Sequence, residues 1–174
     1  MVKNQSGGQL EYAVFDTGWG WMGVLQSPQG LRAIVLPQPT VADALKSLGA
    51  AAPIGSMNSK RFERLIEQIR DYLAGNPLSF QCEIDFSMAT SFQRLVWYKT
   101  KGIRYGQSRS YAWIASEIGK PKACRAVGQA LGRNPLPIVI PCHRVVGSHG
   151  SCGGFRGGLD MKKRLLKLEG IEVA

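Results

Sequence analysis

The chain has 174 residues, of which 44% are hydrophobic and 20% are charged, and its formal net charge is +10. This length and composition are typical of a soluble globular protein with one large domain or two small ones. The sequence has no apolar run of membrane length, and its first ten residues lack the apolar core of a signal peptide. We therefore exclude a membrane protein and expect a cytoplasmic protein, or a nuclear one if the source is eukaryotic.

The first half of the chain is expected to form a sheet with helices. Runs of strand-forming residues are separated by the turn signals "TGWG" and "PQG", which predicts an antiparallel meander. Apolar residues at helical spacing predict a short helix around 40–48 and a longer one over 58–75. The predicted strands are 10–16, 21–27, 31–37 and 80–86.

The second half has a different character. A helix capped by Ser91 is followed by a basic loop, and residues 110–134 then hold two short helical patterns broken at "GKPK". Two helices with small residues around a glycine turn are typical of a helix-turn-helix, although such pairs also occur as plain core packing. A glycine-rich loop leads into a last helix within 159–170, whose leucines can pack while its lysines stay solvated.

The predicted fold class is α/β with two domains. Residues 1–88 would form an N-terminal antiparallel sheet with helices, and residues 89–174 a mostly helical domain that contains the helix-turn-helix. The basic charge lies in the second domain, because residues 1–90 carry 7 Lys and Arg against 8 Asp and Glu whereas residues 91–174 carry 15 against 4. A solvated basic face would have the same composition, but so sharp an asymmetry favours nucleic acid as the partner.

The four cysteines do not indicate a disulfide framework or a metal site. They are widely spaced and include no C-x-x-C pair, and no signal peptide directs the chain to an oxidising compartment. Cys142, His143, His149 and Cys152 lie within eleven residues. Adjacent Cys and His rarely chelate one ion, however, and the spacing matches no structural zinc pattern, so we predict no metal.

The segment "PIVIPCHRVVG" at 137–147 is the strongest candidate for chemistry. Its β-branched residues predict a buried strand that Pro141 ends, which places Cys142 at a strand end facing a cleft. His143 and Arg144 would put positive potential beside the sulfur and favour the thiolate. A lone cysteine is more often an inert small hydrophobe, and spacing alone does not supply the third group that would orient the histidine.

The sequence "IPCHRV" at 140–145 resembles the active-site signature of the O6-alkylguanine-DNA alkyltransferases, also called methylated-DNA–protein-cysteine methyltransferases. The resemblance covers nearly all of residues 90–174, with several separated motifs in family order. The first half resembles the family's variable N-terminal domain only in size and strand–helix order. The other motifs are "FQxxVW" from Phe92, "SY" at 110–111, "RAVGxAxxxNP" from Arg125, "GGF" with "GGL" at 153–159, and "LLxLEG" at 165–170.

The resemblance implies a suicide reaction without a cofactor. Cys142 would be the alkyl acceptor, His143 its base acting through a water molecule, and Glu169 the carboxylate that orients His143. Tyr111 would donate to ring N3 of the guanine. The thioether product is not readily hydrolysed, so the protein would be consumed after one turnover.

The resemblance also implies how the base is selected and how double-stranded DNA is bound. The backbone carbonyls of Cys142 and Val145 would accept from the guanine amino group, and a backbone N–H near Arg156 would donate to O6. A helix at about 121–132 would enter the minor groove of DNA containing O6-alkylguanine, and the monomeric protein would flip the damaged base out. Arg125 would fill the vacated stack. The remaining implied residues are Ala126 and Gly128 (close approach to the groove), Leu131 and Phe155 (apolar walls) and Asn134 (a hinge).

Two departures from the family pattern and two other functions remain open at this point. Arg104 and Gln107 replace a usual proline and glutamate, and Phe155 and Arg156 replace a usual tyrosine and serine. Arg156 puts the shape of the pocket in question. A non-catalytic sensor of alkylated bases would carry another residue in place of Cys142, and a Cys-His-Glu hydrolase would show multiple turnovers.

Overall fold

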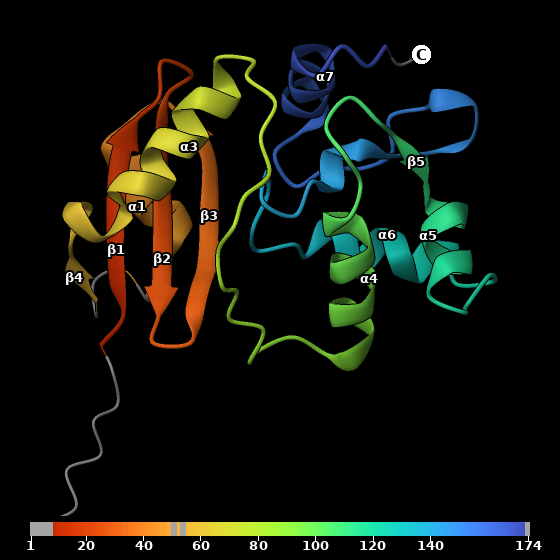
Figure 1. Cartoon of the computed structure of the whole chain (residues 1–174), viewed down its shortest axis with the longest axis horizontal. Helices are drawn as coiled ribbons and strands as arrows, with labels where there is room; N and C mark the ends of the chain where they lie inside the picture. The colour runs from red at the N-terminus through yellow and green to blue at the C-terminus, as the bar shows by residue number, and fades with distance from the viewer. Residues whose placement is uncertain (1–8, 50–51, 53–54, 173–174) are drawn as a thin grey trace, which may run out of the picture. The chain divides into compact units, whose positions relative to one another are not determined.

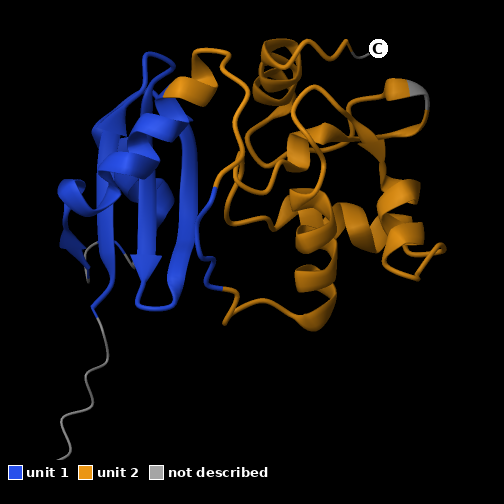
Figure 2. Ribbon diagram, in the orientation of Figure 1, with its two compact units in different colours: residues 1–70, 81–85 blue, residues 71–80, 86–174 orange. Residues whose placement is uncertain are grey.

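The computed structural model describes residues 9–49, 52 and 55–172, and the chain divides into two compact units (Figure 2). Unit 1 comprises Met1–Arg70 and Gln81–Asp85, and unit 2 comprises Asp71–Phe80 and Phe86–Ala174. The domain boundary at residues 88 and 89 stays a proposal. Among the described residues, no helix is long and apolar enough to cross a membrane.

Unit 1 is built on a sheet with the strand order β3-β2-β1-β4 (Figure 1). Its strands are β1 (Glu11–Asp16), β2 (Trp21–Ser27), β3 (Gly30–Gln38) and β4 (Ser56–Met57). The predicted meander is confirmed, because β1 pairs antiparallel with β2 and β2 with β3, while β4 adds a short parallel pairing to β1.

The helix α1 (Val41–Leu48) packs against β2 and β3, and the predicted helix around 40–48 is confirmed. Its N-cap is Thr40, whose side chain accepts from the backbone N–H of Asp43. Gly23 on β2 allows the close approach, because a Cβ there would lie 2.8 Å from the Leu48 side chain. The sheet and α1 share a small apolar core of Leu25, Val35, Leu48 and Ala52.

The predicted helix over 58–75 is confirmed as a 3-10 turn, η1 (Ser59–Phe62), that runs into α3 (Glu63–Leu73). The chain leaves α3 at Gly75, which has a positive φ of 95° and donates its backbone N–H to Tyr72 O. The residues of α3 up to Arg70 belong to unit 1, and the last turn, which carries Tyr72, belongs to unit 2.

The predicted strand over 80–86 is wrong. This segment makes one isolated parallel bridge, between Leu31 and Ile84, through Leu31 N to Glu83 O and Asp85 N to Leu31 O at 2.9 Å each. Alternating apolar residues suit a strand face, but only a neighbour that runs alongside over several residues makes a strand. Here residues 81–85 belong to unit 1, whereas the residues before and after them belong to unit 2.

Unit 2 is mostly helical. Its longer elements are α4 (Ser91–Lys101), α5 (Tyr111–Glu117), α6 (Cys124–Gly132) and α7 (Leu159–Leu168). Its short ones are β5 (Arg109–Ser110), η2 (Cys142–Arg144), β6 (Val145–Val146) and η3 (Ser148–Gly150). The strands β5 and β6 pair in parallel.

The two helices predicted within 110–134 are confirmed as α5 and α6, and both pack against each other and against α4. Trp97 of α4 donates its indole N–H to Ala130 O of α6 at 2.9 Å. Two boundaries differ from the predictions. The cap of α4 is Thr90, which forms a capping box with Gln93, rather than Ser91, and α6 begins at Cys124 rather than near residue 121.

The predicted strand before Cys142 is also wrong. Residues 135–140 form turns in which Ile140 N donates to Leu136 O and Ile138 adopts a positive φ of 76°. Three prolines, at 135, 137 and 141, remove backbone donors that a ladder would need. The apolar side chains here are buried because the turns pack into the core, and Cys142 begins the 3-10 turn η2 instead of ending a strand.

Candidate active site

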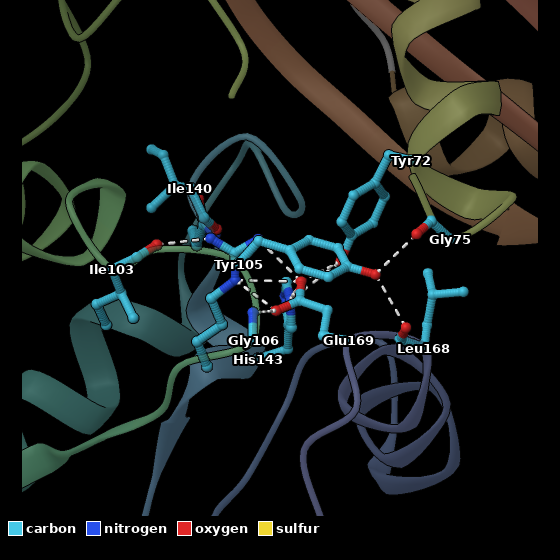
Figure 3. A network of polar contacts seen from close by, with 11 residues as sticks. Tyr72, Gly75, Ile103, Tyr105, Gly106, Ile140, His143, Leu168 and Glu169 are labelled. Carbon is cyan, nitrogen blue, oxygen red and sulfur yellow. Dashed lines mark hydrogen bonds and ion pairs between the residues drawn. The ribbon is translucent and has the colours of Figure 1, made fainter. Parts of the chain in front are cut away.

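The polar centre of unit 2 is the carboxylate of Glu169, the residue that follows α7 (Figure 3). Its Oε1 accepts from Tyr72 Oη at 2.6 Å and from His143 Nε2 at 2.8 Å. Its Oε2 accepts from Arg144 Nε at 2.8 Å and from Gly106 N at 3.2 Å. Burial raises the pKa of Glu169, but the hydrogen bonds from His143, Arg144 and Tyr72 outweigh it and lower that pKa to about 2. Glu169 is therefore an ionised, buried acceptor.

His143 is fully buried, and its tautomer follows from its partner. Because the Glu169 carboxylate can only accept, the imidazole proton must lie on Nε2. Nδ1 is then an unprotonated acceptor, and no described residue donates a hydrogen bond to it. Burial lowers the pKa of His143 below its ordinary value of 6.5, so the ring is a neutral base with an available lone pair.

Arg144 is directed away from the sulfur and toward the carboxylate. Its Nε and Nη2 both donate to Glu169, and its Nη1 donates to Ile103 O at 2.6 Å. The guanidinium lies 5.9 Å from the ring centroid of Tyr105. In this geometry the two buried charges compensate each other, and the carboxylate is fixed in one orientation.

Cys142 lies at the start of η2 and is 7% exposed. The side chain of Asn134 donates from Nδ2 to Cys142 Sγ at 3.0 Å and to Ile140 O at 2.8 Å, while its Oδ1 accepts from Leu136 N at 2.9 Å. Through these three hydrogen bonds, Asn134 connects the segment that follows α6 to the cysteine. Burial raises the pKa of the Cys142 thiol to about 11, although the hydrogen bond from Asn134 acts in the opposite direction.

The prediction that flanking positive charge favours a thiolate is therefore wrong for the resting protein. His143 is neutral, Arg144 is paired with Glu169, and the thiol holds its proton because its surroundings are dry. The cation that does lower the pKa of Cys142, by its charge, is Lys162 of α7.

Lys162 contradicts the prediction that the lysines of the last helix are solvated, because it is fully buried. Its Nζ donates to Val145 O at 2.7 Å and to Gly153 O at 3.3 Å, and it lies 5.8 Å from the ring centroid of Tyr111. Burial lowers the pKa of Lys162. Val145, whose carbonyl the resemblance assigns to the guanine amino group, thus already accepts a hydrogen bond from Lys162.

Tyr111 is the first residue of α5 and is held between two glycines. A Cβ on Gly128 of α6 would lie 3.7 Å from its ring, and a Cβ on Gly153 would overlap its hydroxyl group. Burial raises the pKa of Tyr111, so the phenol keeps its proton and can donate it in a hydrogen bond. Gly153 therefore cannot take a larger residue without moving the tyrosine, whereas a Cβ at Gly128 would be in ordinary van der Waals contact with the ring.

A cleft of about 800 Å³ opens beside Tyr111. It brings together four of the residues predicted to bind DNA or the base, and the other four lie outside its described lining. Those that line it are Arg125, Gly128, Phe155 and Arg156, of which both arginines are exposed. Those outside it are Ala126, which is exposed, and Leu131, Asn134 and Val145, which are buried.

Within the described part of the chain, no group of three or more His, Cys, Asp or Glu side chains is arranged to hold a metal ion. The side chain of His149, one member of the cluster considered from the sequence, lies outside the described residues. In the part of the chain that the structure describes, no disulfide joins the cysteines Cys82, Cys124, Cys142 and Cys152.

Residues 91–171 match the family model described as the DNA-binding domain of 6-O-methylguanine DNA methyltransferase. A methylated-DNA–protein-cysteine methyltransferase from Mycolicibacterium paratuberculosis is 48% identical over 112 residues, which is 64% of this chain and 67% of that protein. One from Methanosarcina acetivorans is 47% identical over 113 residues, 65% of this chain and 72% of that protein. The chain belongs to this methyltransferase family.

Solved structures of the family extend the likeness to both units. A crystal structure of Mycobacterium tuberculosis OGT in complex with DNA matches with a TM-score of 0.75 and 34% identity, over 91% of this chain and 92% of that one. The O6-methylguanine-DNA methyltransferase of Pyrococcus kodakaraensis matches with a TM-score of 0.67 and 30% identity, over 93% and 99%. The predicted α/β fold class and family are confirmed.

Sequence reasoning missed Tyr72 and Lys162. Nothing local marks Tyr72, because its partner Glu169 lies 97 residues further along the chain. Lys162 did leave a signal, since it is spaced three and four residues from Leu159, Leu165 and Leu166 and so shares their apolar face.

The buried carboxylate predicts a loss of stability in acid. The folded-state pKa of Glu169 lies below its ordinary value of 4.5, so its contribution is complete above that value and is lost as the pH falls from 4.5 toward about 2. Because the His143 pKa is also lowered, protonation of the unfolded chain begins to destabilise the fold below pH 6.5. Between about pH 5 and about pH 3, urea titrations should show Glu169 alone costing about 2 kcal/mol of unfolding free energy.

The variant Glu169→Gln should lose this part of the acid dependence while being less stable at neutral pH, because Arg144 is left without its partner. Glu117→Gln is the matched control, since it removes an exposed ion pair with Lys99. An acid slope that is the same in wild type and Glu169→Gln would contradict the assignment of a buried, ionised Glu169.

Proposed function

We propose that this protein repairs DNA by transferring the alkyl group of O6-alkylguanine to its own Cys142, once per molecule. The observation that carries the assignment is a buried thiol next to a neutral histidine whose Nδ1 is an unused acceptor and whose Nε2–H is fixed by an ionised carboxylate. A thiol with a pKa raised to about 11 needs a base at neutral pH, and an oriented imidazole is a suitable one.

In the proposed reaction, the Cys142 thiol passes its proton to His143 Nδ1 through a water molecule. The sulfur then attacks the carbon attached to guanine O6. A bond forms between sulfur and carbon, the bond between that carbon and O6 breaks, and guanine leaves with the bonding electron pair. Glu169 stabilises the imidazolium, and the charge of Lys162 and the amide of Asn134 stabilise the developing thiolate.

Two groups would assist the leaving guanine. Tyr111 keeps its proton and would donate to ring N3, which makes the base a better leaving group. A backbone N–H near Arg156 would donate to O6, and the carbonyls of Cys142 and Val145 would select the guanine amino group. The proposed reaction needs no cofactor, because the DNA supplies the alkyl group and the protein supplies the sulfur that accepts it.

The protein would bind double-stranded DNA as a monomer through the minor groove. The helix α6 would present Ala126 and Gly128 to the groove, since small residues allow close approach. Arg125, exposed at the start of α6 and beside the cleft, would fill the space left by the flipped base. Asn134, at the end of this helix region, would link DNA binding to the position of the thiol.

A non-catalytic sensor of alkylated bases would not need this arrangement. Such a protein binds the flipped base without a nucleophile, whereas here a cysteine, Cys142, directly precedes His143, whose ring is hydrogen-bonded to Glu169. A hydrolase with the same three residues would release its product and turn over repeatedly.

The first prediction is stoichiometric methyl transfer to one cysteine. After incubation with duplex DNA containing O6-methylguanine, intact-mass spectrometry should show one added methyl group per protein, and peptide mapping should place it on Cys142. Cys142→Ala should abolish the transfer and retain DNA binding. Methylation of Cys82, Cys124 or Cys152, or more than one demethylated lesion per protein, would reject the proposed function.

A second prediction concerns the space that Gly153 leaves for Tyr111. In Gly153→Ala the added methyl overlaps the Tyr111 hydroxyl, so the phenol must move and the transfer rate should fall by roughly tenfold or more. Gly154→Ala is the matched control, because a Cβ there meets no atom within 4 Å. Single-turnover rates on methylated duplex should therefore separate the two variants, and equal rates would refute the role given to Tyr111.

A third prediction tests the role of Arg125 in base extrusion. Arg125→Ala should slow alkyl transfer from a lesion in duplex DNA more than transfer from free O6-benzylguanine, because only the duplex requires the base to be flipped out. Arg133→Ala removes an equal charge from the exposed end of the same helix and, with the protein in excess over its Kd for the DNA, should leave both rates nearly unchanged. Equal losses on both substrates for Arg125→Ala would overturn this role.

A further inference from the structure

Tyr72 lies on the last turn of α3 and is completely buried. Its ring packs edge-on against Phe80 and Tyr105, with centroid distances of 6.0 and 6.1 Å, and its hydroxyl points at the carboxylate of Glu169 (Figure 3). A phenol surrounded by other side chains in this way has little freedom to turn, so the position of its hydroxyl is fixed by packing.

Only one assignment of protons satisfies the hydrogen bonds around this hydroxyl. A phenol has a single proton, and the 2.6 Å contact gives it to Oε1 of the ionised Glu169. The phenolic oxygen also lies 3.2 Å from His143 Nε2, which must carry the imidazole proton. The Nε2–H therefore faces two acceptors, Glu169 Oε1 and the oxygen of Tyr72.

We propose that Tyr72 is a positioning residue of the alkyl-transfer site, which sets the basicity of His143 through the oxygen that the two side chains share on Glu169. This inference rests on the proposed function. Among the described residues, the hydroxyl of Tyr72 contacts Glu169 and His143, and Tyr72 is not part of the cleft lining, so we expect it to act through those two side chains.

Sharing one oxygen makes the two donors compete. The Tyr72 O–H draws electron density from Oε1, which weakens the hold of that oxygen on the protonated ring. The remaining charged groups that act on His143 are Glu169, which raises its pKa, and Arg144 and Lys162, which lower it. Removing the hydroxyl takes away the more distant acceptor of Nε2–H, at 3.2 Å, but frees the closer one, Oε1 at 2.8 Å, from its competing donor. The removal would thus strengthen the pairing of Glu169 with imidazolium and raise the pKa of His143.

The carboxylate itself would stay in place without Tyr72. Arg144 donates from Nε to Oε2 at 2.8 Å and from Nη2 to Oε1 at 2.9 Å, and Gly106 N donates to Oε2, so both oxygens keep a donor when the phenol is removed. The effect of removing the hydroxyl should therefore be confined to His143, which distinguishes a positioning role from general loss of packing.

Tyr105 offers a matched control. It is a neighbouring tyrosine whose hydroxyl donates to two backbone carbonyls, Gly75 O at 3.2 Å and Leu168 O at 2.9 Å, and to neither Glu169 nor His143 (Figure 3). Tyr105→Phe removes the same atom as Tyr72→Phe from the same region but leaves the shared oxygen untouched.

The experiment measures two quantities in each variant. The first is the single-turnover rate of methyl transfer to Cys142 as a function of pH. The second is the titration of the His143 ring nitrogens by NMR with 15N-labelled histidine, which is simple because the sequence has two histidines and a His149→Gln background leaves one. The NMR titration does not depend on alkyl transfer.

In Tyr72→Phe, the ring titration and the acid limb of the rate profile should both move to higher pH, and Tyr105→Phe should leave both unchanged. A shift of one pKa unit would lower the rate about tenfold at a pH below both values, because the neutral fraction of the ring falls by that factor. Fluorotyrosine placed at position 72 keeps the shape and is a stronger donor, so it should move both quantities to lower pH.

The outcomes separate the two proposals. A wild type that transfers no methyl to Cys142 would overturn the proposed function, whatever the titrations show. A wild type that transfers methyl, combined with a Tyr72→Phe variant that matches Tyr105→Phe in rate profile and titration, would overturn the role of Tyr72 alone. If Tyr72→Phe does not fold, the fluorotyrosine variant still decides the question by the direction of its shift.

Discussion

An ionised carboxylate in a dry interior is costly unless donors surround it, and Glu169 is surrounded by them. Its two oxygens receive hydrogen bonds from Tyr72, Gly106, His143 and Arg144. These donors come from three separate stretches of the chain, so this one charge requires the end of α3, the loop after α4 and the turn η2 to meet beside the end of α7. Unit 2 cannot be assembled with any of these stretches displaced without leaving a buried charge unpaired.

The same constraint sets the resting chemistry of the site. With Glu169 ionised and Arg144 paired to it, the imidazole of His143 stays neutral and presents Nδ1 as an acceptor. Burial keeps Cys142 protonated, and a neutral thiol is a weak nucleophile toward electrophiles met at random. Under the proposed function this is useful, because a protein that is consumed by a single reaction should not react until the correct base is in place.

The sequence predicted what depends on neighbouring residues. The hairpins of β1 to β3, the helices α1 and α3, and the pair α5 and α6 have local signals in turn residues, caps and periodicity, and all were found. The strand predictions at 80–86 and 137–141 failed because a strand needs a partner. For 80–86 the pairing found among the described residues is the single bridge at Leu31, and prolines prevent a ladder at 137–141.

The site shows the same division between local and distant information. The pair Cys142 and His143 is visible in the sequence, and the family resemblance supplied Glu169, but Tyr72 could not be found because no periodicity connects α3 to the end of α7. The positive charge beside the sulfur was attributed to the wrong residues for a related reason. Successive positions in a 3-10 turn point in different directions, so Arg144, two residues after Cys142, faces the carboxylate.

The buried cations also change what the basic second half means for DNA binding. Two of its fifteen Lys and Arg residues, Arg144 and Lys162, are buried, and neither can contact a phosphate. Arg144 is neutralised by Glu169, and Lys162 donates to backbone carbonyls beside the thiol. The electrostatic attraction to DNA must therefore come from the remaining cations, including the exposed Arg125 and Arg156 at the cleft, while the two buried ones serve the chemistry of the interior. The net charge of a sequence counts cations that can attract DNA together with cations that are buried. Only the burial of each residue distinguishes the two kinds.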